Sequence, residues 1–222
     1  MEKRGLRMNK KLSYTVGVIS LILFLILALI VKMKYMHGPI PVLDLAVQKF
    51  AGDLQGVSWL VALASLIATL LGDAGGAVVG LIIIVALYFV FKQRVAAIWL
   101  AFNIVIAVGG NTVLKILIGR VRPETYRLPA FAHESGMSFA SGHSVFATIL
   151  FGTLFLIIVQ TVRSQSAKVI SGILAVGLIG LTMFSRVLIG VHYPSDTIGG
   201  LLIGITVLAL TYPTYVNYLR RN

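Results

Sequence analysis

Three short polar segments lie beside long apolar stretches of this sequence, at residues 115–123, 141–143 and 185–196. Ionisable groups placed next to hydrocarbon are costly in free energy, and this cost favours a functional role for them. Three fixed positive charges in these segments come from Lys115, Arg122 and Arg186. An arginine fork pairs with two phosphate oxygens and lysine adds a point charge, so the three side chains predict a phosphate-binding site.

Ser141 and Gly142 come just before the fourth apolar stretch of the chain. The free N–H groups and the dipole at the start of a helix attract an anion, and serine is common at the capping position. Glycine allows the backbone to approach an oxyanion closely. We therefore expect Ser141 and Gly142 to complete the phosphate-binding site.

Two histidines could carry out the reaction itself. His192 precedes Asp196 by four residues, and a carboxylate there can hold one imidazole nitrogen and leave the other as a nucleophile. His143 lies beside the predicted phosphate site. It can protonate the leaving oxygen and then deprotonate the water that cleaves a phosphohistidine. The three basic side chains would stabilise the charge on the transferring phosphoryl group.

Metal-assisted hydrolysis is the competing mechanism. A two-metal site needs bridging carboxylates that reach two ions about 4 Å apart. Apart from Glu2, the acidic residues are scattered without a DxD or HExxH pattern: Asp44, Asp53, Asp73, Glu124, Glu134 and Asp196. The chain has no cysteine, so neither a thiolate metal site nor a disulfide framework is available. We expect a metal-free reaction without a cofactor.

Together, the three segments resemble the type 2 phosphatidic acid phosphatase family, whose motifs are KxxxxxxRP, PSGH and SRxxxxxHxxxD. Residues 115–123 match the first motif and residues 185–196 the third, whereas Ala140 replaces the proline of the second. The resemblance implies that His192 is the nucleophile, that Asp196 orients it and that His143 is the general acid. It also implies a set of phosphate-binding residues: Lys115, Arg122, Ser141, Gly142 and Arg186.

Single residues of these motifs also have structural explanations, because basic side chains often anchor the ends of membrane spans. Their joint occurrence on one face of the membrane favours function. Asn103 and Asn111 are expected to form hydrogen bonds between helices, and Asn111 could also support the site. Gly200 and Gly204 form a GxxxG pattern that predicts close helix packing. Glu134 could contact a lipid headgroup.

The composition is that of an integral membrane protein. The chain has 222 residues, of which 58% are hydrophobic and only 12% charged, compared with about a quarter charged in soluble domains. The apolar residues form blocks long enough to cross roughly 30 Å of hydrocarbon. We predict an all-α polytopic bundle, a single domain over residues 1–222, with six spans near residues 14–31, 77–91, 95–118, 145–162, 169–188 and 197–215.

The segment between the first two spans contains two shorter helical patterns. Residues 42–54 have apolar residues at helical spacing with polar residues between them, which predicts an amphipathic helix at the membrane interface. Residues 57–71 are apolar but short and end at the glycine-rich break of residues 72–76. We expect a helix that dips into the interface or packs on the bundle. A full span here is the alternative, and it would reverse the orientation of everything downstream.

The distribution of basic residues predicts the orientation. Lys3, Arg4 and Arg7 precede the first span, and a cytoplasmic N-terminus places most of the 19 basic residues inside, as the positive-inside rule requires. The three polar segments then lie at the outer face of a plasma or inner membrane. The net charge of +12 is explained by span flanks that meet anionic lipid, so no nucleic-acid partner is expected.

The leading functional hypothesis is a lipid phosphate phosphatase that acts on a monoester or diphosphate in the outer leaflet. The resemblance allows undecaprenyl diphosphate, which we place first, and also phosphatidylglycerol phosphate, phosphatidic acid or diacylglycerol diphosphate. A vanadate-dependent haloperoxidase, with vanadate on His192, is a second class, although such enzymes are typically soluble. A lipid-phosphate transporter or scaffold is a third, but the sequence lacks the inverted repeat of many transporters.

Overall fold

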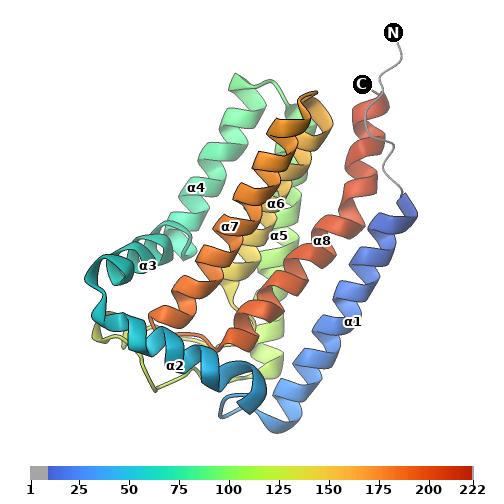
Figure 1. Cartoon of the computed structure of the whole chain (residues 1–222). Coiled ribbons are helices and arrows are strands. Elements are labelled where there is room, and N and C mark those ends of the chain that lie inside the picture. Colours follow the sequence, from blue (N-terminus) through green and yellow to red (C-terminus); the bar gives the residue numbers. More distant parts are fainter. Residues whose placement is uncertain (1–9, 222) are drawn as a thin grey trace.

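The computed structural model describes residues 10–221, which form helices joined by loops (Figure 1). Lys3, Arg4 and Arg7, which the predicted orientation uses, lie outside the described residues. The elements are α1 (Lys10–Lys34), the π-helical η1 (Pro41–Leu45), α2 (Ala46–Asp53), η2 (Leu54–Gly56), α3 (Ser58–Leu70), α4 (Asp73–Val85), the π-helical η3 (Ala86–Val90), α5 (Arg94–Ile118), η4 (Pro129–Phe131), α6 (Gly142–Thr161), α7 (Gln165–Leu188) and α8 (Pro194–Arg221).

Within residues 10–221, six helices are long and apolar enough to cross a membrane: α1, α4 with η3, α5, α6, α7 and α8. Their lengths of 18 to 26 residues correspond to at least about 27 Å at 1.5 Å per residue. The six predicted spans are thereby confirmed. Most of the observed helices begin a few residues before the predicted limits, because their first turns contain polar residues that the apolar blocks leave out.

The predicted break at residues 72–76 is wrong in extent. Only Gly72 has an extended backbone, and α4 begins at Asp73. A Cβ on Gly75 would lie 2.0 Å from the carbonyl oxygen of Thr69, so this glycine, in the first turn of α4, permits the tight turn between the end of α3 at Leu70 and the start of α4.

The segment from η1 to α3 lies across the end of the bundle where α1 ends (Figure 1). Residues 41–56 and 58–70 meet at a bend of 114°. The 13 residues of α3 are about 20 Å long, which is too short to cross roughly 30 Å of hydrocarbon alone. α3 contacts α7 and α4, as expected of a helix that packs on the bundle. α2 exposes apolar side chains such as Val47 and Phe50, as expected at an interface.

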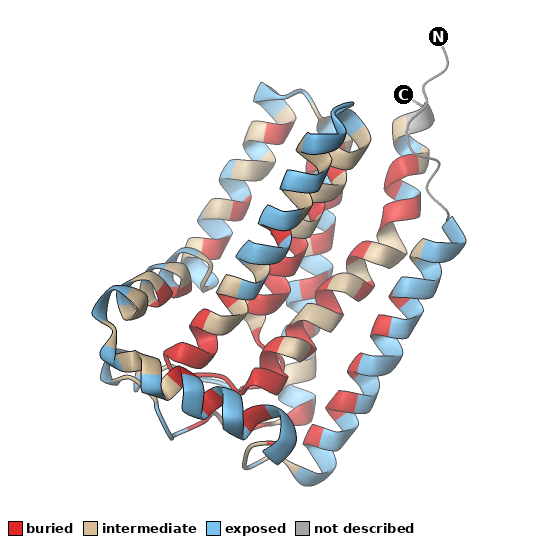
Figure 2. Ribbon diagram, in the orientation of Figure 1, coloured by how far each residue is buried: buried red, intermediate tan, exposed pale blue. Residues whose placement is uncertain are grey.

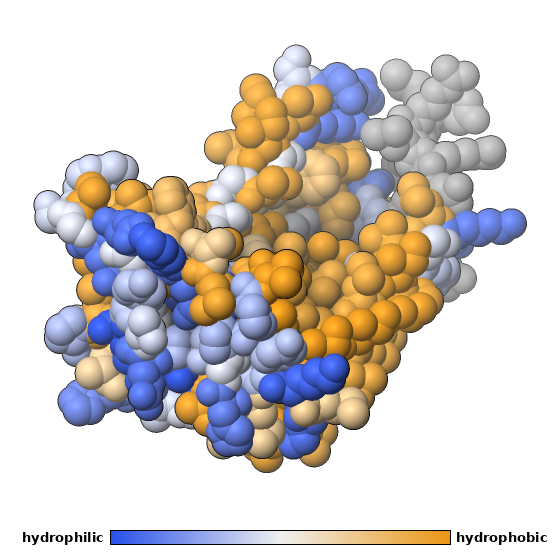
Figure 3. Space-filling view, turned by 60° about the horizontal axis from the view of Figure 1, so that its bottom comes forward, coloured by the Kyte–Doolittle hydropathy of each residue, from blue (hydrophilic) through white to orange (hydrophobic). Residues whose placement is uncertain are grey.

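The bundle buries a continuous apolar core around α8, which contacts α1, α5 and α6. The sides of the bundle are apolar and exposed; Figure 2 shows much of α1, α4 and α7 as exposed, and α1 alone exposes several leucines and isoleucines. A surface of this kind needs a lipid environment. Figure 3 brings the end that carries α2 forward and shows hydrophilic residues gathered there.

The predicted GxxxG packing is confirmed between α8 and α6. A Cβ on Gly200 would lie 2.6 Å from the carbonyl oxygen of Ser141 and 2.8 Å from the Cβ of Ser144. Any larger residue would push these helices apart. Gly200 therefore brings the first turn of α6, with His143, close to the first turn of α8, with Asp196.

Candidate active site

The three predicted polar segments meet at the end of the bundle that carries α2. They surround a cavity of about 550 Å³. Six of the eight predicted site residues line it: Lys115, Arg122, Gly142, His143, Arg186 and His192. The other two, Ser141 and Asp196, are completely buried behind them. The candidate site therefore combines the last turns of α5 and α7, the first turn of α6, and the two loops at residues 119–141 and 189–193.

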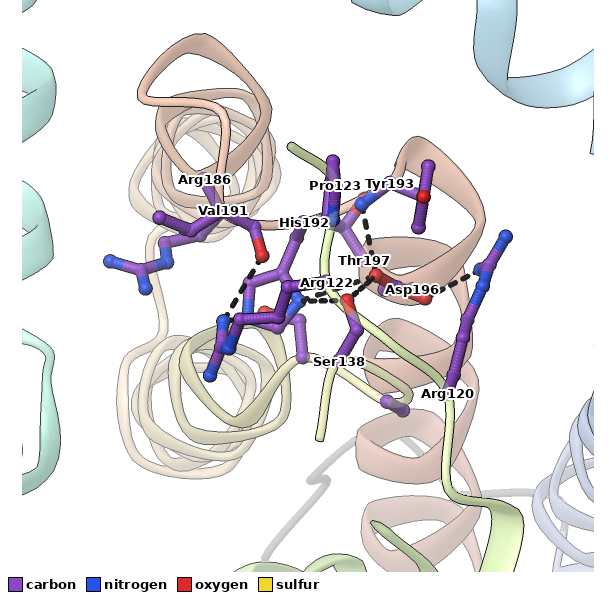
Figure 4. Close-up of polar contacts among 12 residues, drawn as sticks. Arg120, Arg122, Pro123, Ser138, Arg186, Val191, His192, Tyr193, Asp196 and Thr197 are labelled. Atoms are coloured by element: carbon purple, nitrogen blue, oxygen red, sulfur yellow. Dashed lines mark hydrogen bonds and ion pairs between the residues drawn. The ribbon is translucent and has the colours of Figure 1, made fainter. Parts of the chain in front are cut away.

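His192 lies between a carboxylate and a guanidinium group (Figure 4). Its Nδ1 is 3.3 Å from Oδ2 of Asp196, and its Nε2 is 3.2 Å from Nη1 of Arg122. A guanidinium group only donates, so Nε2 accepts this hydrogen bond and the hydrogen of the neutral ring is on Nδ1, facing Asp196. This is the tautomer that a nucleophilic Nε2 requires.

The environment keeps this imidazole neutral. Only 1% of the surface of His192 is exposed. Burial holds the pKa of His192 well below its usual value, and the positive charges of Arg122 and Lys115 lower it further. Since the neutral ring retains a lone pair on Nε2, the site favours nucleophilic attack at neutral pH.

Ser138, which belongs to none of the three motifs, also contacts this pair. Its hydroxyl donates to Oδ2 of Asp196 and lies 3.3 Å from Nδ1 of His192. The same carboxylate oxygen accepts the backbone N–H of Tyr193 at 2.9 Å. Three groups thus fix the position of Oδ2 beside the imidazole.

The second oxygen of Asp196 belongs to a buried ionic network centred on Arg120. Nη1 of Arg120 donates to Oδ1 of Asp196 at 2.6 Å, and Nη2 donates to Oδ2 of Asp44 at 3.1 Å. All three side chains are 0% exposed. The guanidinium also lies over the ring of Tyr193, 4.1 Å from its centroid.

Asp44 connects this network to the interfacial segment. It lies in η1 and accepts hydrogen bonds from the backbone N–H and hydroxyl of Ser195, at 2.8 and 2.9 Å, and from the N–H of Ile40 at 2.7 Å. Asp44 lies in the predicted interfacial helix of residues 42–54, and Arg120 lies at an unspecified position of the first motif, so no role was predicted for either. Their charge beside apolar segments was the available signal, but their pairing depends on tertiary contacts between residues 76 positions apart.

The three predicted phosphate-binding cations lie side by side along the cavity. Nζ of Lys115 donates to the carbonyl oxygen of Met137 at 2.7 Å. Arg122 donates to three backbone oxygens at 3.0 to 3.1 Å, and burial lowers its pKa; a guanidinium remains charged nonetheless. Arg186 is 1% exposed and pairs with Glu134. Among residues 10–221, no group of three or more His, Cys, Asp or Glu side chains is placed to hold a metal ion.

His143 is held by α3, the last helix of the segment that crosses the end of the bundle. Its Nε2 lies 2.9 Å from the carbonyl oxygen of Ala68 in α3, and because a carbonyl only accepts, Nε2 carries a hydrogen in this arrangement. The ring lines the cavity. α3 therefore does more than pack on the bundle: it orients the predicted general acid.

The turn before α6 has the predicted cap. The hydroxyl of Ser141 accepts the N–H of Ser144 at 3.5 Å, and its own N–H donates to the backbone oxygen of Asp196 at 3.0 Å. Ser141 does not line the cavity, whereas Gly142 does. Asn111 donates to the carbonyl oxygen of Ala140 at 3.2 Å, so it supports this turn from α5. The predicted interhelical bond of Asn103 is formed with Thr211, at 2.9 Å.

The overall fold is that of a known class of membrane protein. The chain superposes on the crystal structure of the first transmembrane PAP2 type phosphatidylglycerolphosphate phosphatase from Bacillus subtilis, with a TM-score of 0.68 and 24% sequence identity. The superposition covers 93% of this chain and 96% of that structure. This likeness establishes the transmembrane PAP2 fold.

The family follows from the sequence match. A sequence model of the PAP2 superfamily matches residues 96–220, more than half of the chain. The protein belongs to the PAP2 superfamily, and the resemblance drawn from the three motifs is confirmed.

Three characterised relatives are similar over part of their length. Phosphatidylglycerophosphatase B of Bacillus subtilis is 36% identical over 105 residues, 45% of this chain and 48% of that protein. Undecaprenyl-diphosphatase of Sulfolobus acidocaldarius is 32% identical over 125 residues, 54% and 56% of the two chains. Lipid A 1-phosphatase of Rhizobium johnstonii is 32% identical over 120 residues, 51% and 45%. The matches cover about half of each relative.

Proposed function

We propose that this protein is a membrane lipid phosphatase that hydrolyses a phosphate monoester or diphosphate through a phosphohistidine on His192. The observation that carries the proposal is the neutral, oriented imidazole of His192, whose Nε2 lies next to Arg122 at a cavity that Lys115 and Arg186 also line. A nucleophile and three cations in one cavity are the parts that phosphoryl transfer requires.

In the first step, Nε2 of His192 attacks phosphorus and the bond from phosphorus to the leaving oxygen breaks. The imidazolium of His143 donates its Nδ1 proton to that oxygen and keeps its Nε2–H on the carbonyl oxygen of Ala68. Asp196 stabilises the positive charge that forms on the imidazole of His192. Lys115, Arg122 and Arg186 stabilise the charge on the phosphoryl oxygens, and the N–H groups at Gly142 add the positive end of the α6 dipole.

In the second step, His143 removes a proton from water as the water oxygen attacks phosphorus. The phosphorus–nitrogen bond breaks, inorganic phosphate leaves and His192 regains its lone pair. No metal ion is needed, because the three basic side chains supply the positive charge.

We place the active site at the outer face of a plasma or inner membrane, with both ends of the chain in the cytoplasm. α1 begins and α8 ends at the same end of the bundle, and the cavity lies at the other (Figure 1). The positive-inside rule supports this orientation. Residues from η1 to α8 contribute to the site, so we also propose that residues 1–222 act as one domain.

Among substrates, we place undecaprenyl diphosphate first. The cavity has room and positive charge for two phosphates, and one of the relatives is an undecaprenyl-diphosphatase. Phosphatidylglycerol phosphate and phosphatidic acid are the alternatives, the former in keeping with a relative that is a phosphatidylglycerophosphatase.

The test is phosphate release by the purified protein in detergent with EDTA present. Undecaprenyl diphosphate, phosphatidylglycerol phosphate and phosphatidic acid are compared for wild type and His192→Ala. We expect EDTA-resistant release that the substitution abolishes, with undecaprenyl diphosphate giving the highest kcat/KM. Undiminished release by His192→Ala would overturn the nucleophile assignment. A lack of release by wild type would overturn the proposed activity.

A further inference from the structure

A five-residue segment, residues 134–138, covers the cations of the cavity. The carbonyl oxygens of Ser135 and Gly136 accept hydrogen bonds from Arg122, and that of Met137 accepts one from Lys115. This segment therefore occupies donors that a phosphate would use.

Glu134 is the charged member of this segment. Its carboxylate forms an ion pair with Nη2 of Arg186, and its Oε1 lies 3.3 Å from Nη1 of Arg122. The same Nη1 is 3.2 Å from Nε2 of His192. The carboxylate thus lies where two of the three cations converge, one guanidinium group away from the proposed nucleophile.

A carboxylate and a phosphate use arginine in the same way. Both accept two parallel hydrogen bonds from the planar fork. Two guanidinium groups that converge at low exposure repel one another unless an anion lies between them. Glu134 supplies that anion, yet the Nε of Arg186 is buried without a hydrogen-bond partner among the described residues. One donor thus remains for an anion with more oxygens than a carboxylate.

We propose that Glu134 is an internal anion that occupies the phosphate subsite of the empty enzyme and is displaced by the substrate's phosphate. The inference rests on the proposed function, because it requires the cavity to be a phosphate subsite. Glu134 is 25% exposed and lies on a loop, so its side chain can turn away without moving a helix. A phosphate dianion has more charge and more acceptor oxygens than the carboxylate, which makes the exchange favourable for phosphate and selective against weaker anions.

The competing explanation is that Glu134 is a fixed support that orients Arg186. The two explanations predict effects of opposite sign. Removing a competitor raises the fraction of empty sites and tightens phosphate binding. Removing a support lets Arg186 move and weakens phosphate binding.

The experiment is isothermal titration of inorganic phosphate into the purified full-length protein in detergent. For Glu134→Gln we expect a Kd about fivefold or more below the wild-type value, since the competing carboxylate is gone. Glu134→Asp keeps the charge on a shorter side chain and should give a Kd nearer to wild type. Circular dichroism checks that each variant is folded.

Asp73→Asn is the matched control. Asp73 lines the same cavity but forms no ion pair among the described residues, so its neutralisation removes one negative charge without removing a competitor. We expect less than half of the effect of Glu134→Gln. An equal effect of Asp73→Asn, or unchanged or weaker phosphate binding by Glu134→Gln, would overturn the proposal.

This measurement does not depend on turnover. Phosphate binding that tightens in Glu134→Gln, together with no release from any lipid, would leave the internal anion standing and overturn the proposed activity. Release from lipids together with no change in phosphate binding would support the proposed activity and overturn the internal anion. No phosphate binding by any variant would overturn the phosphate subsite and with it the role of Glu134.

Discussion

Replacing Arg120 by methionine would leave Asp44 and Asp196 as two buried carboxylates without the cation that they share. Both contacts are short, at 3.1 and 2.6 Å, and all three side chains are inaccessible to solvent. Removing one partner of a buried ion pair costs about 3–5 kcal/mol, because the remaining charge has no compensation. We expect Arg120→Met to lower the free energy of unfolding by at least this amount.

The neighbouring carboxylate provides a double-mutant cycle. Asp44→Asn removes one of the two unpaired charges, so the double variant Arg120→Met/Asp44→Asn should recover about 0.5–3 kcal/mol of unfolding free energy relative to Arg120→Met alone, the range measured for residues in one network. Activity should not recover, because Asp196 still lacks the partner of its Oδ1. If Arg120 acted on activity only through stability, both would recover together in the double variant.

The assays are unfolding in mixed detergent micelles and kcat for phosphate release. Arg120→Lys is the conservative control, because lysine keeps the charge but cannot bond both carboxylates as a planar fork does. Its unfolding free energy and kcat should lie between those of wild type and Arg120→Met. A loss of less than about 1 kcal/mol of unfolding free energy in Arg120→Met would contradict this prediction, since a value that small is typical of exposed ion pairs. So would full recovery of kcat in the double variant.

Three further predictions concern the surroundings of the nucleophile. Ser138→Ala removes the hydroxyl that holds Asp196 and should lower kcat about tenfold, equivalent to 1.36 kcal/mol, with little change in KM in steady-state assays. The lowered pKa of His192 means that, below about pH 6.5, the unfolded imidazole binds a proton that the folded one does not. Stability measured by thermal unfolding should therefore fall as the pH drops through this range, and less so in His192→Asn. Gly200→Ala would place a Cβ 2.6 Å from a backbone oxygen and should cost about 1–3 kcal/mol in the same unfolding assay, whereas Gly109→Ala, with nothing within 4 Å, should not.

The fold could be predicted because its signal is local. Apolar blocks of sufficient length specify spans whatever lies around them, and the short block at residues 57–71 could be set apart by length alone. The π-helical turns η1 and η3 could not be predicted, because the sequence pattern of a π-turn does not differ from that of an α-helix. The break after residue 71 was predicted too long, since a glycine inside the first turn of a helix and a glycine outside it look alike in sequence.

Some residues of the candidate site could likewise be predicted from sequence and others could not. Lys115, His143 and His192 could be found because each lies in a motif of fixed spacing. Arg120 and Glu134 could not, because their importance comes from burial and from partners far away in the chain. Arg120 reaches Asp196 across 76 positions and Arg186 reaches Glu134 across 52.

The proposed mechanism transfers the phosphoryl group to His192. The most direct test is rapid-quench trapping with radiolabelled undecaprenyl diphosphate, followed by peptide mapping. A His143→Ala variant is included, because the leaving oxygen of a diphosphate needs little protonation, whereas hydrolysis of the phosphohistidine still needs a base. We expect an acid-labile, base-stable phosphoryl group on His192 that accumulates in His143→Ala and is absent from His192→Ala. A phosphoryl group on another residue, or labelling that persists in His192→Ala, would contradict it.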